Sequence, residues 1–353
     1  MSIIVFLIIL TLLVLVHELG HFIAARKNGV RVDEFGIGFP PRLFSIKKGE
    51  TTYSINAIPI GGFVKLYGEE YHENTKKELR QKAFVYKKPW QKATIIIGGV
   101  VGNFLLAWVL ISYLFTQGVP APINKVLVEN VISNTPAAKA GIKKNDIIFA
   151  IKETNKKSPI TSSNDLIDIS KKYGDRQIIL LIERDGQTLE TTITPRKNPP
   201  SGQGPLGVVI TSFMEKKYSW YQAPFFGLIE SFKISQKIAV EVVNTLVKLV
   251  TFQKPQVDVA GPIGIAQYTG QAIKFGKNAI LELLALLSLN LAIVNILPFP
   301  ALDGGRLIFV IYEWVSKKRV NQTIERYLNL AGIIILLSLA LLISYRDIVR
   351  LIR

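Results

Sequence analysis

Two histidines, four residues apart, stand in an N-terminal segment that is otherwise apolar enough to lie in lipid. Residues 3–16 are nearly all apolar and lead directly into His17-Glu18-Leu19-Gly20-His21, after which apolar chain resumes. At this spacing both imidazoles lie on one helix face, close enough to bind a single metal ion. Glu18, between them, is placed to activate a water molecule bound to that metal. In a membrane helix, this pattern indicates peptide-bond hydrolysis within the bilayer.

The rest of the composition limits the remaining ligands of such a metal. The chain of 353 residues has no cysteine and three histidines, the third being His72. Disulfides and thiolate metal sites are therefore excluded. His72 lies among glutamates in a polar stretch, which favours a solvated surface residue over an accessory metal site. A zinc site in this chain must therefore take a carboxylate as its third protein ligand.

The positive charge is better explained by membrane topology than by nucleic acid. The formal net charge is +17, yet the basic residues flank apolar segments and form no single patch interleaved with aromatics. Fourteen Lys and Arg fall between Arg26 and Lys92, a stretch without a membrane-spanning segment. Loops of this kind stay in the cytoplasm. We therefore expect no nucleic-acid partner and a cytoplasmic 26–92 loop.

Four segments are long and apolar enough to span a bilayer: residues 2–25, 93–116, 278–299 and 326–346. With the 26–92 loop inside, the N-terminus and residues 118–277 lie outside. A short basic loop between the third and fourth spans is then cytoplasmic. The N-terminus lacks a positive region and a small-residue cleavage site, so we expect no signal-peptide cleavage.

The third span supplies the missing carboxylate. Pro298 and Pro300 break this helix, and Asp303 follows the break near the cytoplasmic end. His17 and His21 are also displaced towards the cytoplasmic end of their helix, so the depths agree. An ordinary capping or interfacial aspartate is the alternative. On the second span, Gly98, Gly99 and Gly102 allow close helix packing, and Asn103 beside them is expected to bond between helices.

The parts outside the spans differ in texture. Residues 51–65 predict two short strands around a Pro/Gly turn, either a soluble hairpin or one that dips towards the membrane. Residues 120–212 predict a compact α+β module with strands at 125–131, 146–152, 177–184 and 188–194 and a helix at 164–173. Residues 219–250 predict an amphipathic helix on the outer membrane surface, with a fifth span as the alternative.

Six motifs spread over nearly the whole chain carry a family resemblance: HELGH at 17–21, GIG at 36–38, GGFVK at 61–65, GNF at 102–104, GPIGIA at 261–266 and NILPFPALDGG at 295–305. The chain resembles the site-2 protease family of intramembrane zinc metalloproteases, in its bacterial RseP-like branch. The resemblance implies that His17, His21 and Asp303 bind Zn²⁺ and that Glu18 is the general base. It implies that Asn295 orients substrate or supports the transition state.

The resemblance also assigns roles outside the metal site. The hairpin with Gly61, Gly62 and Phe63 resembles a membrane-associated β-loop that pairs with an unwound substrate helix. The 120–212 module resembles a PDZ domain that binds a peptide or a protein C-terminus, its groove flanked by a helix at 165–173. One such module is present, whereas RseP has two in tandem. The GPIGIA segment is either a conserved family region or a loop leading into the third span.

Together these features predict a multi-pass α-helical membrane protein of the cell inner or plasma membrane, with an inserted extracytoplasmic PDZ domain. Residues 1–117 and 278–353 form the two halves of the protease core, 120–212 the PDZ domain, and 219–277 the surface helix and a connection. Expected partners are the lipid bilayer and single-pass membrane proteins cleaved in regulated intramembrane proteolysis, such as an anti-sigma factor or signal-peptide remnants. An inactive PDZ scaffold would bind no metal, and a metal transporter would carry acidic residues or histidines along several helices.

Overall fold

The computed structural model describes residues 2–69, 77–153, 156–251 and 260–352. His72 lies outside these residues. The chain divides into two compact units, one formed by residues 1–114 and 220–353 and the other by residues 115–219.

Four helices of the first unit are long and apolar enough to cross a membrane, among the residues described: α1 (Ser2–Lys27), α3 (Pro89–Gln117), α8 (Lys277–Ile296) and α10 (Gln322–Ile352). The four predicted spans are thereby confirmed, with α10 longer than predicted. The predicted third span is wrong at its end, because α8 stops at Ile296, before Pro298 and Pro300. The supposed loop that follows contains a further helix, α9 (Asp303–Ser316).

Glycines bring the backbones of α1 and α3 into contact. A methyl group added at Gly20 would collide with the carbonyl of Gly98, and one added at Gly102 would lie 2.8 Å from the carbonyl oxygen of Val16. Small residues at this spacing allow two helices to approach more closely than larger side chains permit. The contact sets the histidines of α1 directly against α3.

Between α1 and α3 the chain forms a two-stranded sheet of β1 (Val32–Lys48) and β2 (Thr51–Leu66). The prediction that residues 51–65 pair with themselves is wrong: both halves of β2 pair with β1. Residues 62–66 and 52–55 flank opposite sides of residues 32–37. The 62–66 segment is therefore an outer edge of this sheet. A short helix, α2 (Lys77–Arg80), and a 3-10 turn (Phe84–Tyr86) lead from the sheet to α3.

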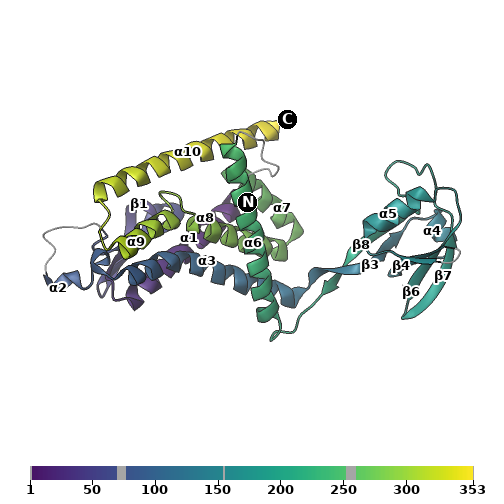
Figure 1. The fold of residues 1–353 in the computed structure, drawn as a ribbon, viewed down its shortest axis with the longest axis horizontal. Coiled ribbons are helices and arrows are strands. Elements are labelled where there is room, and N and C mark those ends of the chain that lie inside the picture. Colours follow the sequence, from purple (N-terminus) through teal and green to yellow (C-terminus); the bar gives the residue numbers. More distant parts are fainter. Residues whose placement is uncertain (1, 70–76, 154–155, 252–259, 353) are drawn as a thin grey trace. The chain divides into compact units, whose positions relative to one another are not determined.

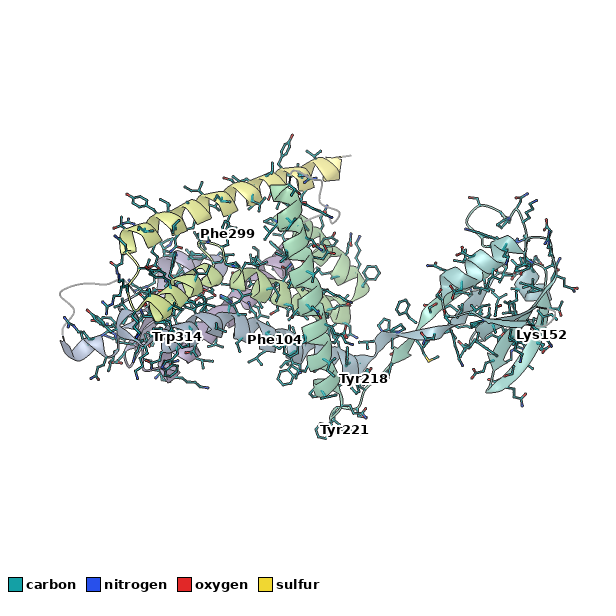
Figure 2. The ribbon with its side chains drawn as sticks, viewed as in Figure 1. Phe104, Lys152, Tyr218, Tyr221, Phe299 and Trp314 are labelled. Carbon is teal, nitrogen blue, oxygen red and sulfur yellow. The ribbon has the colours of Figure 1, made fainter. Side chains whose placement is uncertain are left out.

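Two further helices pack on the spans. The helix α6 (Ala223–Val250) runs across the direction of α3 and α10 (Figure 1). Phe104 of α3, labelled in Figure 2, meets Phe232 of α6 with ring centroids 4.9 Å apart. The GPIGIA segment forms the start of α7 (Pro262–Phe275), so its interpretation as a loop is wrong.

The last span, α10, is attached to its neighbours by polar contacts. The carboxylate of Asp347 accepts hydrogen bonds from the backbone N–H groups of Gly261 and Gly264, both 2.9 Å, at the start of α7. Asn329 Oδ1 accepts a hydrogen bond from the backbone N–H of Ala301. Much of the apolar surface between these points faces outward, with Leu337 60% and Leu341 72% exposed.

The second unit is a six-stranded sheet with two short helices. Its strands are β3 (Val119–Val131), β4 (Ile147–Glu153), β5 (Lys156–Pro159), β6 (Ile178–Arg184), β7 (Gln187–Ile193) and β8 (Val208–Lys216), and its helices are α4 (Pro136–Lys139) and α5 (Ser163–Lys172). The strand order is β7-β6-β4-β3-β8, with β5 paired to β4. The four predicted strands and the predicted helix are confirmed within a few residues, except that β3 begins six residues earlier. β5 and β8 were not predicted.

Local sequence explains this unit well. Alternating apolar residues of the strands and Leu166 of α5 form one buried core. The Asp185-Gly186 turn, with both residues at positive φ, joins β6 to β7. Ser162 and Asp165 form a reciprocal capping box at the start of α5.

A buried ion pair ties β6 to the loop before β4. Asp146 is 1% exposed and accepts hydrogen bonds from Nε and an Nη of Arg184, both 2.7 Å, and from the backbone N–H of Lys143. Burial opposes the charged form of Asp146, but Arg184 and the Lys143 N–H outweigh it and hold the pKa of this carboxyl below its usual range.

We expect Asp146→Asn to lower the free energy of unfolding of residues 115–219 by about 3 kcal/mol at neutral pH, because the guanidinium of Arg184 loses its charged partner. The folded-state pKa of Asp146 is depressed, so its contribution is complete above an unfolded-state pKa of about 4 and is lost as the pH falls below it. Urea unfolding of the full chain in detergent measures both effects, with the unfolding of this unit detected by its susceptibility to a protease.

The matched control is Glu190→Gln, which removes the exposed partner of Lys152. This change should alter stability by less than about 1 kcal/mol. Equal loss of stability on acidification in the wild type and in Asp146→Asn would contradict the assignment.

Candidate metal centre

The two histidines of α1 converge one helical turn apart. His17 and His21 are 7% and 8% exposed, and their Nε2 atoms lie 3.2 Å from each other. Their rings stand nearly perpendicular, with centroids 4.7 Å apart. Both Nε2 atoms therefore point to the same position beside the helix.

Asp303 brings a carboxylate to that point. It is the first residue of α9, after a non-helical stretch that includes both prolines. Its Oδ2 lies 3.0 Å from His17 Nε2 and 3.2 Å from His21 Nε2. Among the described residues, these three form the one group of donors close enough together to share a metal ion.

The donor set fits a zinc ion. Asp303 Oδ2 is buried and accepts no hydrogen bond of acceptable angle from the described residues, despite its closeness to both Nε2 atoms. Buried polar atoms without such a partner are uncommon and call for an explanation, such as an ion. Two imidazoles and one carboxylate match a catalytic zinc site, which keeps a further position open for water or substrate.

The helix α3 holds the other side of both imidazoles. His21 Nδ1 lies 2.8 Å from the carbonyl oxygen of Ile95, so a proton on Nδ1 is donated there and Nε2 is left free to bind a metal. His17 Nδ1 lies 3.4 Å from the amide of Asn103, whose Oδ1 is buried without a partner among the described residues. Turning this amide over would present Oδ1 to a proton on His17 Nδ1. Asn103 thus bonds between helices, as expected, and does so at a histidine.

Asn295 reaches the site from the last turn of α8. Its Nδ2 lies 3.3 Å from His17 Nε2. The structure therefore brings Asn295 to the same point as the two histidines and Asp303. An amide here can donate to an oxygen of a bound peptide.

Glu18 contacts the sheet. Its Oε2 accepts a hydrogen bond from the backbone N–H of Val64 at 3.0 Å. Val64 belongs to the 62–66 edge of β2, so this edge lies beside the metal centre. Thr11 of α1 also donates to the carbonyl oxygen of Pro59, which fixes the start of the same half of β2.

The glycines before Val64 shape this edge. Gly61 has φ +78°, and a methyl group on it would lie 3.5 Å from Val14 of α1. Gly62 packs against the carbonyl of Gly36, and Phe63 stacks on Phe39 with centroids 6.4 Å apart. The three predicted hairpin residues thus lie directly before Val64 in β2.

Sequence reasoning missed two contacts of the site. The carbonyl of Ile95 and the N–H of Val64 are backbone groups, and no side-chain pattern marks a backbone group as a partner. The signal that could have found Ile95 is its place one turn before Gly99, on the glycine face of α3.

Comparisons with known proteins show the family to which the chain is similar. The model of peptidase family M50 matches residues 5–339. A Clostridium perfringens protein, provisionally named a zinc metalloprotease, is 33% identical over 354 residues, covering 99% of each chain. The regulator of sigma-W protease RasP of Bacillus subtilis is 29% identical over 427 aligned positions, and the zinc metalloprotease RasP of Bacillus licheniformis is 30% identical over 429, each covering 99% of both chains.

Gly99 gives a direct test of the site. A methyl group at this position would lie 2.5 Å from His21 Nε2 and 2.7 Å from His17 Nε2. We expect Gly99→Ala to displace both imidazoles from their present positions and to lower the amount of zinc bound per chain several-fold. Elemental analysis of the purified protein in detergent measures this loss.

Val101→Ala on the same helix is the control, since Val101 is 46% exposed and points away from the histidines. It should keep the zinc content of the wild type. Full zinc content in Gly99→Ala would show that the metal lies elsewhere.

Proposed function

Because the chain belongs to peptidase family M50 and is a zinc metalloprotease, we propose that His17, His21 and Asp303 hold the zinc and that Glu18 is the general base of peptide-bond hydrolysis inside the membrane. The convergence of Asp303 Oδ2 on both Nε2 atoms, at 3.0 and 3.2 Å, carries this proposal. When bound, zinc supplies Lewis acidity to the scissile carbonyl and to the attacking water.

Glu18 moves the proton. Its Oε2 is engaged by the N–H of Val64, so Oε1 is the oxygen that takes a proton from the attacking water. The same carboxylic acid then gives the proton to the leaving amine. The Val64 hydrogen bond fixes the orientation of the carboxylate throughout.

Asn295 orients the substrate. Its Nδ2 donates a hydrogen bond to the oxygen of the scissile carbonyl, where negative charge develops. The 3.3 Å distance to His17 Nε2 supports this role, since it places the amide at the reacting point.

The depth of the site supports cleavage within the bilayer. His21 lies six residues before Lys27, the basic end of α1, which is about 9 Å along a helix axis. Gly99 lies ten residues after Pro89 at the start of α3, or about 15 Å. Both estimates put the donors below the polar surface, inside about 30 Å of hydrocarbon.

We place the 26–92 segment in the cytoplasm, because of its fourteen Lys and Arg, and residues 115–219 outside. The crossing direction of α6 then supports a helix in the plane of the outer surface (Figure 1). Its sequence is also not among the four candidate spans of the described chain.

The edge of β2 receives the substrate. A helical peptide hides its carbonyl groups, so the cleaved segment must first unwind. The 62–66 edge has its other side paired to β1 and lies beside Glu18, which holds the Val64 N–H. An extended peptide can add as a strand to the remaining outward backbone groups of this edge.

Residues 115–219 act as a PDZ domain. A peptide or a protein C-terminus would add to the edge strand β8 beside the adjacent helix α5, where Val209 and Ile167 are exposed. A hydrogen bond from the N–H of Ser163 to Ser212 Oγ joins the two elements at one end.

The substrates are single-pass membrane proteins already shortened outside the membrane. The name of the Bacillus subtilis relative, a regulator of sigma-W, favours an anti-sigma factor among them. A metal transporter is disfavoured, because the described spans hold one cluster of metal donors and no series along several helices.

Replacing Glu18 by Gln tests the general base. We expect this variant to keep the zinc content of the wild type, because Glu18 is not a ligand, and to lose at least about 100-fold in cleavage rate. Fragment masses after incubation with truncated single-pass proteins measure the rate. Wild-type activity in Glu18→Gln would remove Glu18 from the mechanism.

Because the chain has no cysteine, a single introduced cysteine can test substrate binding at the 62–66 edge by disulfide crosslinking. In the Glu18→Gln background, Phe63→Cys should form a disulfide with a cysteine placed near the scissile bond of a substrate. Leu43→Cys is the control, because Leu43 is 70% exposed on the distal segment of β1. Equal crosslinking at both positions would argue against pairing at the 62–66 edge.

A further inference from the structure

The preceding membrane helix, α8, does not by itself fix the position of Asp303, because it ends at Ile296. The segment 297–302 is non-helical, and Ala301 within it has φ +73°, a conformation that non-glycine residues rarely adopt. Leu302, the residue before α9, offers no side-chain cap. Something other than a continuous helix must therefore hold α9 in place.

Apolar packing of α9 is slight. Its buried residues in the described structure are Gly304, Gly305 and Val310, and the two glycines pack on backbone carbonyls of residues 296–299. Most other apolar side chains of α9 face outward, including Ile311 and Val315 at 48% and 80% exposure. Dispersion contacts alone fix this helix weakly.

An ion pair joins the C-terminal half of α9 to α3. Lys92 Nζ lies 2.7 Å from Glu313 Oε2, and the two side chains are 6% and 18% exposed. Lys92 precedes Ile95, whose carbonyl contacts His21, by one helical turn. This pair therefore connects α9 to the part of α3 that also holds a histidine of the metal centre.

A second ion pair joins the first turn of α9 to the end of β2. Arg306, three residues after Asp303, places an Nη atom 2.7 Å from Glu69 Oε1. Glu69 follows the strand whose Val64 contacts Glu18. Both pairs thus connect α9 to elements that already contact the histidine motif.

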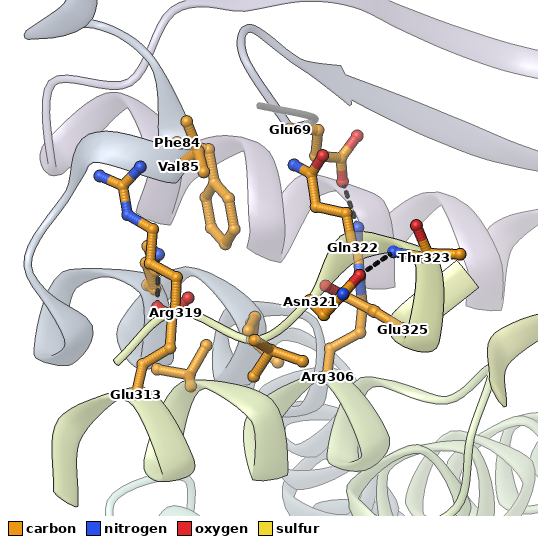
Figure 3. Close-up of a pocket in the computed structure, with 14 residues that line it drawn as sticks. Glu69, Phe84, Val85, Arg306, Glu313, Arg319, Asn321, Gln322, Thr323 and Glu325 are labelled. Atoms are coloured by element: carbon orange, nitrogen blue, oxygen red, sulfur yellow. Dashed lines mark hydrogen bonds and ion pairs between the residues drawn. The ribbon is translucent and has the colours of Figure 1, made fainter. Parts of the chain in front are cut away.

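The two pairs line a cavity of about 440 Å³ (Figure 3). Arg306 and Glu313 extend into it from the same helix, about two turns apart. Because this space beside α9 is not filled by side chains, packing cannot substitute for the charges.

We propose that these two ion pairs, Lys92–Glu313 and Arg306–Glu69, form a clamp that sets the position of Asp303 relative to His17 and His21. The four residues are positioning residues that act through Asp303. The proposal rests on the zinc-binding role given to Asp303 above. The Lys92–Glu313 pair is largely buried, whereas the side chains of Arg306 and Glu69 are 42% and 29% exposed. A buried ion pair adds little net stability but demands a defined geometry, so the first pair carries most of the positioning and the second supports it.

Zinc affinity of the full chain in detergent tests the clamp, measured by competition with a chelator. We expect Glu313→Gln to raise the free zinc needed for half-occupancy about 10- to 100-fold, as loss of a partner that orients a metal ligand does elsewhere. Exchange of the pair, Lys92→Glu with Glu313→Lys, should restore most of that affinity. Glu69→Gln should weaken zinc binding in the same direction.

Asp347→Asn is the matched control. It removes a buried carboxylate of the same unit whose two hydrogen bonds go to the start of α7. It should lower stability and leave the zinc affinity unchanged. If Glu313→Gln behaves in the same way, the clamp is a general structural feature and the proposal is overturned.

A second readout needs no metal. Spin labels on Val101→Cys of α3 and Val315→Cys of α9, both exposed, report the distance between these helices in the metal-free chain. The distance distribution should broaden in Glu313→Gln and stay narrow in Asp347→Asn. An unchanged distribution in Glu313→Gln would also overturn the proposal.

Asp303→Asn separates the two levels of inference. If it leaves zinc affinity unchanged, the ligand assignment fails, whatever the clamp does. If it lowers the affinity while Glu313→Gln and Glu69→Gln do not, the ligand assignment stands and the clamp fails.

Discussion

The close contact between α1 and α3 is the constraint on which the proposed metal centre depends. Three polar donors and Glu18 are costly within apolar helices unless each has a partner. The glycine face of α3 lets the backbone approach so closely that the carbonyl of Ile95 and the amide of Asn103 reach the histidine rings. A helix with larger side chains there would leave no room for the imidazoles and no acceptor for their outer nitrogens.

The site is divided between a continuous helix and a broken one, and this division turns a carboxylate towards the histidines. The histidines stand on one regular helix, whereas the carboxylate begins a new helix after a break. A break inside the membrane exposes backbone groups, which is tolerated only where protein or water satisfies them. Here the first turn of α9 folds back on the carbonyls it follows, and the break becomes the means of turning a carboxylate towards the histidines.

Much of this arrangement is readable from the sequence, because hydrophobic length and motif spacing are local signals. The four spans, four of the six strands of the second unit and the pair His17 and His21 follow from such signals, and the two prolines point to Asp303. The β1–β2 pairing, β8 and α9 do not, since each depends on partners distant in the chain. Backbone contacts such as Val64 N–H to Glu18 carry no mark in any side-chain pattern.

The sparse attachment of α10 has a consequence for how the sequence of this helix can vary in evolution. Near one end it meets Ala301 through Asn329, and near the other it caps α7 through Asp347. Between those positions, outward residues such as Leu337 and Leu341 meet little but hydrocarbon. Natural variation at those outward positions should range freely among aliphatic residues. Asn329, Asp347 and Gly332, where a methyl group would collide with the carbonyl of Pro300, should stay fixed. The fourth span would then look like the least related part of an otherwise recognisable protein.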